Sequence, residues 1–301
     1  MRNSSQPDAA GLVFGVGAYT LWGVLPLYLH LLKAVPALQV LAHRVLWSVA
    51  LLALLILVLR RARGIATAAR GRTLLLLVGS AVMIGINWIV YIWAVQNGHV
   101  LEASLGYFIN PLVNVALGFA FLGERLRRLQ AGAIAIAAAG VILLAVSGGG
   151  ALWLSLLLAM SFGLYGLLRK VAAIDALGGL TVETLLLAPF SIAVLLYAGQ
   201  SGTAAFGQST HLDLLLALAG VVTTAPLLLF AAAARRLPLA TLGLLQYIAP
   251  TLQFAEAVLL FGEPMHTIHI ITFTMIWTGC ALYAFDAIRA VRAAAPAPVL
   301  E

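Results

Sequence analysis

Three titratable side chains lie inside long apolar segments of the sequence, where charge is costly. His43 and Arg44 stand in the run LAHRVLWS, and Glu183 stands in LTVETLLLAP. An arginine at the centre of a membrane helix costs about 2.5–3.5 kcal/mol, so Arg44 needs a partner or water. A histidine exchanges its proton near neutral pH, and a carboxyl group can hold a proton where water is scarce. His43 and Glu183 are therefore candidate proton-coupling groups, and a structural ion pair is the alternative.

The segment FINPLVNVALGFAFLGE, residues 108–124, carries uncharged polar side chains at helical spacing. Tyr107, Asn110 and Asn114 are three and four residues apart, which places them on one face of a helix. Pro111 removes a backbone donor and frees a carbonyl oxygen, which lipid does not satisfy but a cavity or a packed neighbour does. We expect this face to point into the protein.

A second segment, YIAPTLQFAEAVLLFGE at residues 247–263, repeats this layout. Aligned on the prolines, Asn114 falls on Gln253, and both segments end in Gly-Glu. Gln246 and Gln253 are seven residues apart and share a helical face, with Tyr247 beside them. We expect this second polar face to point inward as well.

Aromatic residues complete the candidate binding groups. Interfacial aromatic belts and hydrogen bonds between helices are the alternative explanations for such residues. As a set, these groups are suited to stacking on a ring and to binding amide, hydroxyl or amino-acid moieties. The candidate substrate-binding residues are Tyr19, Trp22, His43, Arg44, Asn87, Trp88, Tyr91, Tyr107, Asn110, Asn114, Tyr165, Glu183, Gln246, Tyr247 and Gln253.

Catalytic and metal-binding patterns are missing from the sequence. It contains no HExxH, no GxSxG and no phosphate-binding glycine loop, and the GGG at 148–150 is better explained as a connector. The ten acidic residues stand mostly at the ends of apolar runs, and the one cysteine, Cys280, lies within such a run. We therefore expect neither an enzyme, nor a metal site, nor a cofactor.

The elements that position these residues are predicted to be membrane helices. The chain is 63% hydrophobic and 9% charged, with a mean hydropathy of +1.08, which excludes a water-soluble domain of 301 residues. A bilayer core takes about 20 helical residues, and continuously apolar runs favour helices over alternating strands. The ten predicted spans are 11–32, 37–59, 73–95, 101–122, 130–146, 151–169, 180–198, 212–232, 240–261 and 268–288.

The positive charges indicate the orientation. If the N-terminus is cytoplasmic, all lysines and arginines except Lys33 and Arg44 fall in cytoplasmic segments, as the positive-inside rule requires. Both termini are then predicted to be cytoplasmic. This placement explains the net charge of +7 without a nucleic-acid partner. The cluster RRARGIATAARGR, residues 60–72, is expected to lie against anionic lipid headgroups.

The repeat extends beyond the two polar segments. AYTLWG at 18–23 aligns with SFGLYG at 161–166, and Tyr91 aligns with Phe230. The two halves are predicted to be residues 1–147 and 151–301, each with five spans. Because five is odd, the second half must enter the membrane from the opposite side. Inverted repeats are the architecture of secondary transporters, in which one half rocks against the other around a central site.

Six segments carry a resemblance to a known family: LWGVLPLY, LAHRVLWS, INWIVYIWAVQNGHVLEASLGYFINPLVNVALGFAFLGERL, SFGLYGLLRK, TAPLLLFAAAARRLP and LLQYIAPTLQF. Over residues 10–290 the chain resembles the RarD branch of the EamA family, in the drug/metabolite transporter superfamily. The resemblance implies a bacterial inner-membrane transporter with ten helices, inverted repeats and a central cavity lined by the first, third, fourth, sixth, eighth and ninth helices. Glu256 and the pair His266 and His269 depart from the family pattern.

These observations together predict an all-α integral membrane protein that works as a secondary transporter. We expect it to export small amphipathic metabolites or drugs by alternating access, and the RarD name is associated with chloramphenicol sensitivity. An importer of the same fold is the alternative, and a membrane scaffold or channel subunit is a weaker one. The expected partners are a small-molecule substrate and the lipid bilayer, and the sequence leaves open whether the protein is a monomer or a homodimer.

Overall fold

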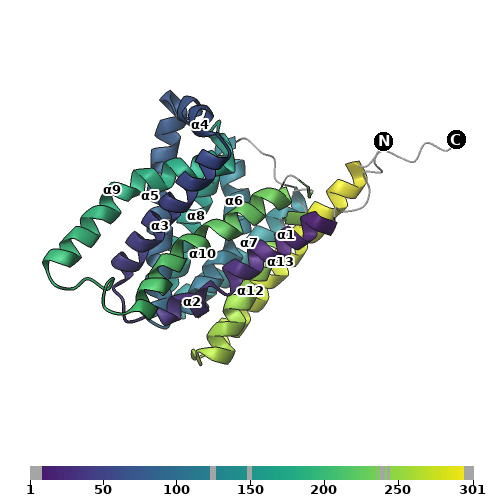
Figure 1. The fold of residues 1–301 in the computed structure, drawn as a ribbon. Helices are drawn as coiled ribbons and strands as arrows, with labels where there is room; N and C mark the ends of the chain where they lie inside the picture. Colours follow the sequence, from purple (N-terminus) through teal and green to yellow (C-terminus); the bar gives the residue numbers. More distant parts are fainter. Residues whose placement is uncertain are drawn as a thin grey trace.

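The computed structural model describes residues 9–122, 127–147, 151–234, 236–237, 241–242 and 245–294, and these ranges contain helices and no β-strand. The helices, labelled as in Figure 1, are α1 (Ala9–Gly23), α2 (Leu25–Leu31), α3 (Ala37–Val58), α4 (Ala62–Ala68), α5 (Gly71–Gln96), α6 (Val100–Leu122), α7 (Arg128–Val146), α8 (Leu152–Val171), α9 (Ala176–Gln200), α10 (Thr210–Ala234), α12 (Ile248–Ala255), the π-helix η1 (Glu256–Leu260) and α13 (Thr267–Ala294).

Nine helical segments in the described ranges are long and apolar enough to cross a membrane. The first is α1 and α2 together, interrupted at Val24. These nine segments confirm the prediction of a multi-pass helical membrane protein. The predicted span at 240–261 lies partly outside the described residues, which show only the shorter apolar helix Ile248–Leu260 there. The tenth span therefore stays a prediction.

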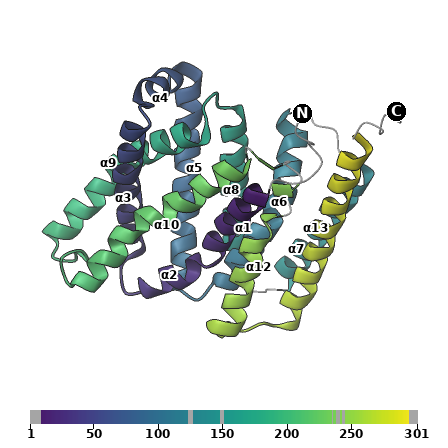
Figure 2. The same cartoon turned by 45° about the vertical axis from the view of Figure 1, so that its right-hand side comes forward.

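The helices form a bundle in which α3 and α9 make one flank and α7 and α13 the opposite flank (Figures 1 and 2). Between the flanks, α8 packs against α5 and α6, and α1 packs against α10 and α12. We call the two ends of the bundle the α4 end, which holds α4 and the start of α9, and the α2 end, which holds α2 and the loop between α9 and α10 (Figure 2).

Small residues bring the helix backbones together. A Cβ atom added at Gly106 of α6 would lie 2.7 Å from the Ser155 carbonyl oxygen of α8. A Cβ at Gly279 of α13 would lie 2.7 Å from the carbonyl oxygen of Ala133 in α7. Lipid is as apolar as the side chains, so membrane helices associate through such close packing.

Side-chain hydrogen bonds tie the α2 end together. The Gln39 side chain of α3 donates to the Thr203 carbonyl oxygen at 2.8 Å and accepts from the Ala205 backbone nitrogen at 2.9 Å, both in the α9–α10 loop. The Gln96 amide nitrogen, at the end of α5, donates to two carbonyl oxygens just beyond α2, at 3.1 and 2.9 Å. Three segments of the chain are thereby joined at this end.

Glu263 is a third side chain that links segments at this end. Its carboxylate accepts hydrogen bonds from the backbone nitrogens of Val100 at 2.8 Å and Leu101 at 2.7 Å, at the start of α6. Those N–H groups have no partner within the helix, and the helix dipole favours a negative charge there. Burial raises the pKa of Glu263 above its ordinary value, although the two backbone hydrogen bonds act to lower it.

We expect Gly106→Ala to destabilise the protein by about 1–3 kcal/mol, because the added methyl group pushes α6 away from α8. The matched control is Gly132→Ala in α7, where a Cβ meets nothing within 4 Å. Thermal unfolding of both purified variants, followed by tryptophan fluorescence, measures the effect. Equal melting temperatures for the two variants would show that α6 and α8 do not depend on this contact.

We expect protonation of Glu263 to favour the folded state at acidic pH. Because its folded pKa is raised, its contribution is complete below about pH 4.5 and is lost as pH rises through the folded value. His99 and Glu102 also interact with the Glu263 carboxylate. The effect of Glu263 is therefore measured as a difference between the protein and a variant that lacks this carboxylate. The melting temperature of the protein minus that of Glu263→Gln should grow as the pH falls from 8 to 5. A constant difference would contradict the expectation.

Candidate functional site

Asn87 connects three helices near the middle of the bundle. Its amide nitrogen donates to the Leu158 carbonyl oxygen and to the Ser161 hydroxyl of α8, both at 3.1 Å. Its amide oxygen accepts from the Tyr107 hydroxyl of α6 at 3.0 Å. Asn87 is 1% exposed, so the protein satisfies an amide that lipid would leave without partners. This network holds α5, α6 and α8 together and orients Tyr107.

Arg44 is buried and held on two sides. Its Nε donates to the Thr223 hydroxyl of α10 at 2.7 Å, and its guanidinium carbon lies 4.6 Å from the centre of the Trp88 ring. A cation over an indole face is stabilised by the ring electrons. The side chain is buried, yet its Nη1 has no hydrogen-bond partner. Arg44 is therefore fixed in position with one donor group left over.

Tyr91 lies one turn along α5 from Trp88, on the same helical face. Tyr91 is buried, packs its ring 5.5 Å from that of Tyr107, and has a hydroxyl group without a hydrogen-bond partner. Glu256 opens the π-helix η1, is buried, and has one carboxylate oxygen without a partner. We call Arg44, Trp88, Tyr91 and Tyr107 the Arg44 cluster.

Glu256 is not among the predicted site residues, because it departs from the family pattern. A signal for it was present, since Gln246, Gln253 and Glu256 are seven and three residues apart and share a helical face. The π-helix that begins at Glu256 has no such signal in the sequence. π-helical turns occur frequently at functional sites.

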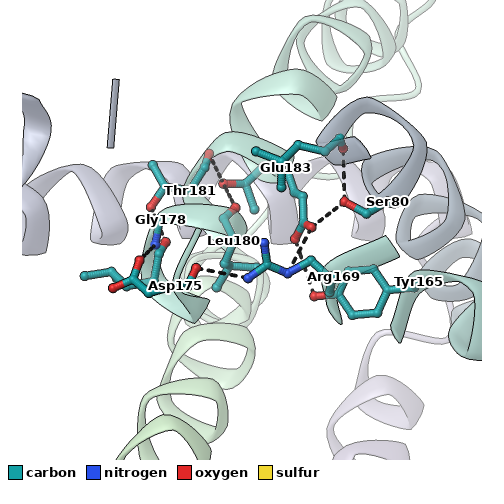
Figure 3. A network of polar contacts seen from close by, with 11 residues as sticks. Ser80, Tyr165, Arg169, Asp175, Gly178, Leu180, Thr181 and Glu183 are labelled. Atoms are coloured by element: carbon teal, nitrogen blue, oxygen red, sulfur yellow. Dashed lines mark hydrogen bonds and ion pairs between the residues drawn. The ribbon is translucent and has the colours of Figure 1, made fainter. Parts of the chain in front are cut away.

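Glu183 lies in a second cluster (Figure 3). It is seven residues from the start of α9 and therefore nearer the α4 end. The Ser80 hydroxyl donates to one carboxylate oxygen at 2.6 Å, and the Tyr165 hydroxyl donates to the other at 3.4 Å. The Nε of Arg169 forms an ion pair with Glu183 at 3.5 Å. We call these four residues the Glu183 cluster. Arg44 makes no ion pair with Glu183, although the two stand at corresponding positions of α3 and α9.

The start of α9 positions Arg169. Asp175 caps α9 by accepting from the Gly178 backbone nitrogen at 2.9 Å, and its carboxylate pairs with Arg61 at 2.8 Å. The Asp175 carbonyl oxygen accepts from Arg169 Nη2 at 3.0 Å (Figure 3). A methyl group at Gly179 would overlap the Arg169 guanidinium group, so glycine at this position lets the guanidinium group keep its observed place.

A cavity of about 250 Å³ lies between α6 and α8. Asn114 is exposed, and its amide oxygen lies 3.6 and 3.7 Å from the positions that a Cβ would take at Gly163 and Gly166. We call this cavity the Asn114 groove. Its lining residues are Asn114, Leu117, Gly118, Gly163, Gly166, Leu167 and Lys170.

Aromatic rings from α1 and α10 form another group of predicted site residues. The ring centres of Tyr19 and Trp22 are 5.5 Å apart, and each lies 6.0 Å from that of Phe230. The Gln253 amide nitrogen donates to the Trp22 carbonyl oxygen at 3.1 Å, which ties α12 to α1. Gln253 keeps a buried amide oxygen without a partner. This group brings three predicted residues together, but apart from Arg44.

Four predicted residues lie elsewhere. His43 stacks on Phe206 of the α9–α10 loop, with ring centres 5.3 Å apart, because adjacent helix residues point about 100° apart and Arg44 takes the inward direction. The ring of Tyr247 stacks on that of Phe108, with ring centres 6.3 Å apart. Gln246 is half-buried in the turn before α12, and Asn110 is buried with its amide oxygen unpartnered. In the described residues, no group of three His, Cys, Asp or Glu is placed to hold a metal ion.

Comparisons with known proteins place these features in a family. Residues 9–146 match the EamA-like transporter family. The chain is similar to the protein named "Uncharacterized transporter" of Vibrio cholerae, with 45% identity over 98% of each chain. It is also similar to "Protein RarD" of Escherichia coli, with 45% identity over 94% of this chain and 96% of the relative.

Two further similarities extend over nearly the whole chain. "Chloramphenicol-sensitive protein RarD" of Pseudomonas aeruginosa is 36% identical over 97% of this chain and 98% of its own length. A solved structure described as "Crystal structure of protein" has a TM-score of 0.62 and 19% identity over 93% of this chain and 98% of that chain. This last similarity concerns the fold alone.

We expect Glu183 and Arg169 to stabilise the fold as a pair. Glu183→Gln alone and Arg169→Gln alone should each lower stability, because each leaves a partner without its opposite charge. The double variant should recover part of the loss, with a coupling of about 0.5–3 kcal/mol. Gly179→Ala should resemble Arg169→Gln, because it displaces the guanidinium group. Thermal unfolding of the four variants measures the cycle, and strictly additive losses would contradict the pairing.

Proposed function

The chain belongs to the RarD branch of the EamA-like transporter family, and from this premise we propose that it is a secondary transporter that exports small amphipathic metabolites or drugs. The proposal rests most directly on the polar groups along α6. From the α2 end, Tyr107 lies in the Arg44 cluster, Asn110 follows, and Asn114 lies in the groove. Polar side chains at this depth are costly in lipid, and their usual use is a substrate pathway.

The arrangement of helices supports two related halves, residues 1–147 and 151–301. The helices α3, α5 and α7 begin at 37, 71 and 128, and α9, α10 and α13 begin at 176, 210 and 267, a constant separation of 139 residues. This is the separation found between the two proline-containing segments. Such regularity is expected of a duplicated five-helix unit.

The packing partners support an exchange between the halves. The pairs α1 with α10 and α8 with α5 are equivalent under exchange of the halves, as are α8 with α6 and α1 with α12. The pairs α3 with α10 and α9 with α5 are equivalent in the same way. An inverted repeat generates such reciprocal pairs, and rocking between the two halves is the usual route to alternating access.

We further propose that the protein lies in the bacterial inner membrane with both termini in the cytoplasm and with a tenth span at 240–261. The α2 end then faces the outside of the cell. Its cross-links through Gln39, Gln96 and Glu263 support an outer end that is closed. The Asn114 groove lies towards the cytoplasmic side of α6, which favours a conformation that receives substrate from the cytoplasm.

Export is favoured over import by the closed outer end and the groove on the cytoplasmic side, and the name of the Pseudomonas aeruginosa relative, "Chloramphenicol-sensitive protein RarD", supplies a drug to test. Cells that overproduce the protein should accumulate less labelled chloramphenicol than cells carrying the empty vector. Greater accumulation would favour an importer of the same fold. Unchanged accumulation of chloramphenicol and of a panel of amino acids and amines would favour a non-transporting membrane protein.

We expect Gly166→Leu to reduce flux at least tenfold, because the larger side chain fills the groove beside Asn114. The matched control is Gly132→Leu in α7, where nothing lies within 4 Å of an added Cβ. Efflux from proteoliposomes loaded with the panel measures both variants at equal protein content. Equal flux in the two variants would contradict a pathway through the groove.

A further inference from the structure

Arginines gather at one corner of the α4 end, where α3 ends, α4 crosses and α5 begins (Figure 2). All are exposed, and none lies in the proposed transport pathway. We call them the arginine patch, which consists of Arg60, Arg61, Arg63, Arg70 and Arg72. The seven residues of α4 span about 10 Å, close to the Debye length of about 8 Å at physiological ionic strength, so these charges act together on a ligand.

The protein leaves most of this positive charge unbalanced. The sequence contains no aspartate or glutamate from residue 9 to residue 101. Within the described residues, one ion pair reaches the patch, that of Arg61 with Asp175 at 2.8 Å, and it is weak because both side chains are about half-exposed. On the opposite flank, by contrast, Arg127 pairs with the buried Asp286 at 2.8 Å. The patch is therefore a concentration of charge that the described chain does not neutralise.

Arg60 has a backbone conformation that favours glycine. Its φ is 54°, in the left-handed region, and among the described residues it is the one non-glycine residue with a positive φ. It ends α3 in a Schellman motif, because the Arg61 backbone nitrogen donates to the Ile56 carbonyl oxygen at 3.1 Å and the Arg60 nitrogen donates to that of Leu57 at 3.2 Å. Glycine adopts this conformation without the steric cost of a side chain. An arginine here therefore needs a reason other than the helix end.

An apolar surface leads up to the patch from both helices. At the end of α3, Leu57, Val58 and Leu59 are 70%, 69% and 51% exposed, and Leu75 near the start of α5 is 73% exposed. Acyl chains cover such side chains in a bilayer, and the headgroups follow directly after the acyl chains. Ile65, the buried residue of α4, holds that helix against the bundle at this level. The patch thus lies where lipid phosphates are expected.

We propose that the arginine patch is a binding site for the headgroups of anionic phospholipids, such as phosphatidylglycerol, in the adjoining leaflet. A guanidinium group presents its donors as a planar fork that binds two phosphate oxygens at once. Phosphatidylcholine carries the same phosphate together with a positive charge, which the patch repels, so the site selects against it. This inference goes beyond the proposed function and does not depend on what the protein transports.

The test uses the full-length protein in a nonionic detergent with an equimolar mixture of phosphatidylglycerol and phosphatidylcholine that have the same acyl chains. The lipid that stays with the protein through gel filtration is extracted and quantified by mass spectrometry. We expect phosphatidylglycerol to be enriched at least about fivefold, the effect of one basic residue near an anionic surface. The enrichment should vanish in about 1 M NaCl, where the Debye length is about 3 Å. Equal retention of the two lipids at low salt would overturn the proposal.

Arginine variants locate the site. Arg60→Gly should lower the enrichment at least twofold while the melting temperature in lipid-free detergent stays equal or rises, because glycine suits the left-handed conformation. The combined variant Arg63→Gln, Arg70→Gln and Arg72→Gln should abolish the enrichment. The matched control is Arg128→Gln at the start of α7, an exposed arginine on the opposite flank, which removes the same charge outside the patch and should keep the enrichment.

Three outcomes would overturn the proposal. Unchanged enrichment in the combined variant would show that the lipid binds elsewhere. An equal loss in Arg128→Gln would show that the net charge of the protein, rather than this corner, attracts the lipid. Release of the bound phosphatidylglycerol by an excess of sodium phosphate in the protein, but not in the combined variant, with no such release by sodium chloride of equal ionic strength, would assign the patch to free phosphate. If Arg60→Gly lowers the melting temperature, the combined variant decides, because its three positions are exposed.

Discussion

A bilayer core offers no hydrogen bonds, and this constraint governs where polar side chains lie in the protein. Asn87 has its amide nitrogen and oxygen bonded to α8 and α6, and Glu183 is surrounded by Ser80, Tyr165 and Arg169. Such groups are acceptable between helices because neighbouring helices replace water. The polar contacts therefore determine which helix faces meet, and the apolar surface that remains faces lipid.

Close packing and polar contacts act together at the interface of α6 with α8. Gly106 allows the backbones to approach, and the Ser155 hydroxyl uses that approach to donate to the Glu102 carbonyl oxygen at 2.6 Å. Further along the same two helices, Gly163 and Gly166 leave the space that becomes the Asn114 groove. Glycine residues thus allow close contact between α6 and α8 near Gly106, and they leave a cavity between the same two helices near Asn114.

The buried charged groups differ in how completely the protein satisfies them. Glu183 has an arginine and two hydroxyl groups around its carboxylate, so its charge is balanced within the fold. Arg44 and Glu256 keep atoms without partners, although both are as deeply buried as core residues. A satisfied cluster stabilises one arrangement of helices, whereas Arg44 and Glu256 keep polar atoms that the described residues do not pair.

The sequence by itself determined the membrane class and the approximate bounds of nine spans, because hydropathy and helical periodicity are local properties of the chain. Only the tertiary structure decided which polar groups meet. Arg44 finds Thr223 and Trp88 rather than an acid, and Glu183 finds Arg169 from the preceding helix. His43 turns to a loop although it adjoins Arg44, and Glu256 begins a π-helical turn. Such partners depend on how helices distant in sequence pack, which no local pattern encodes.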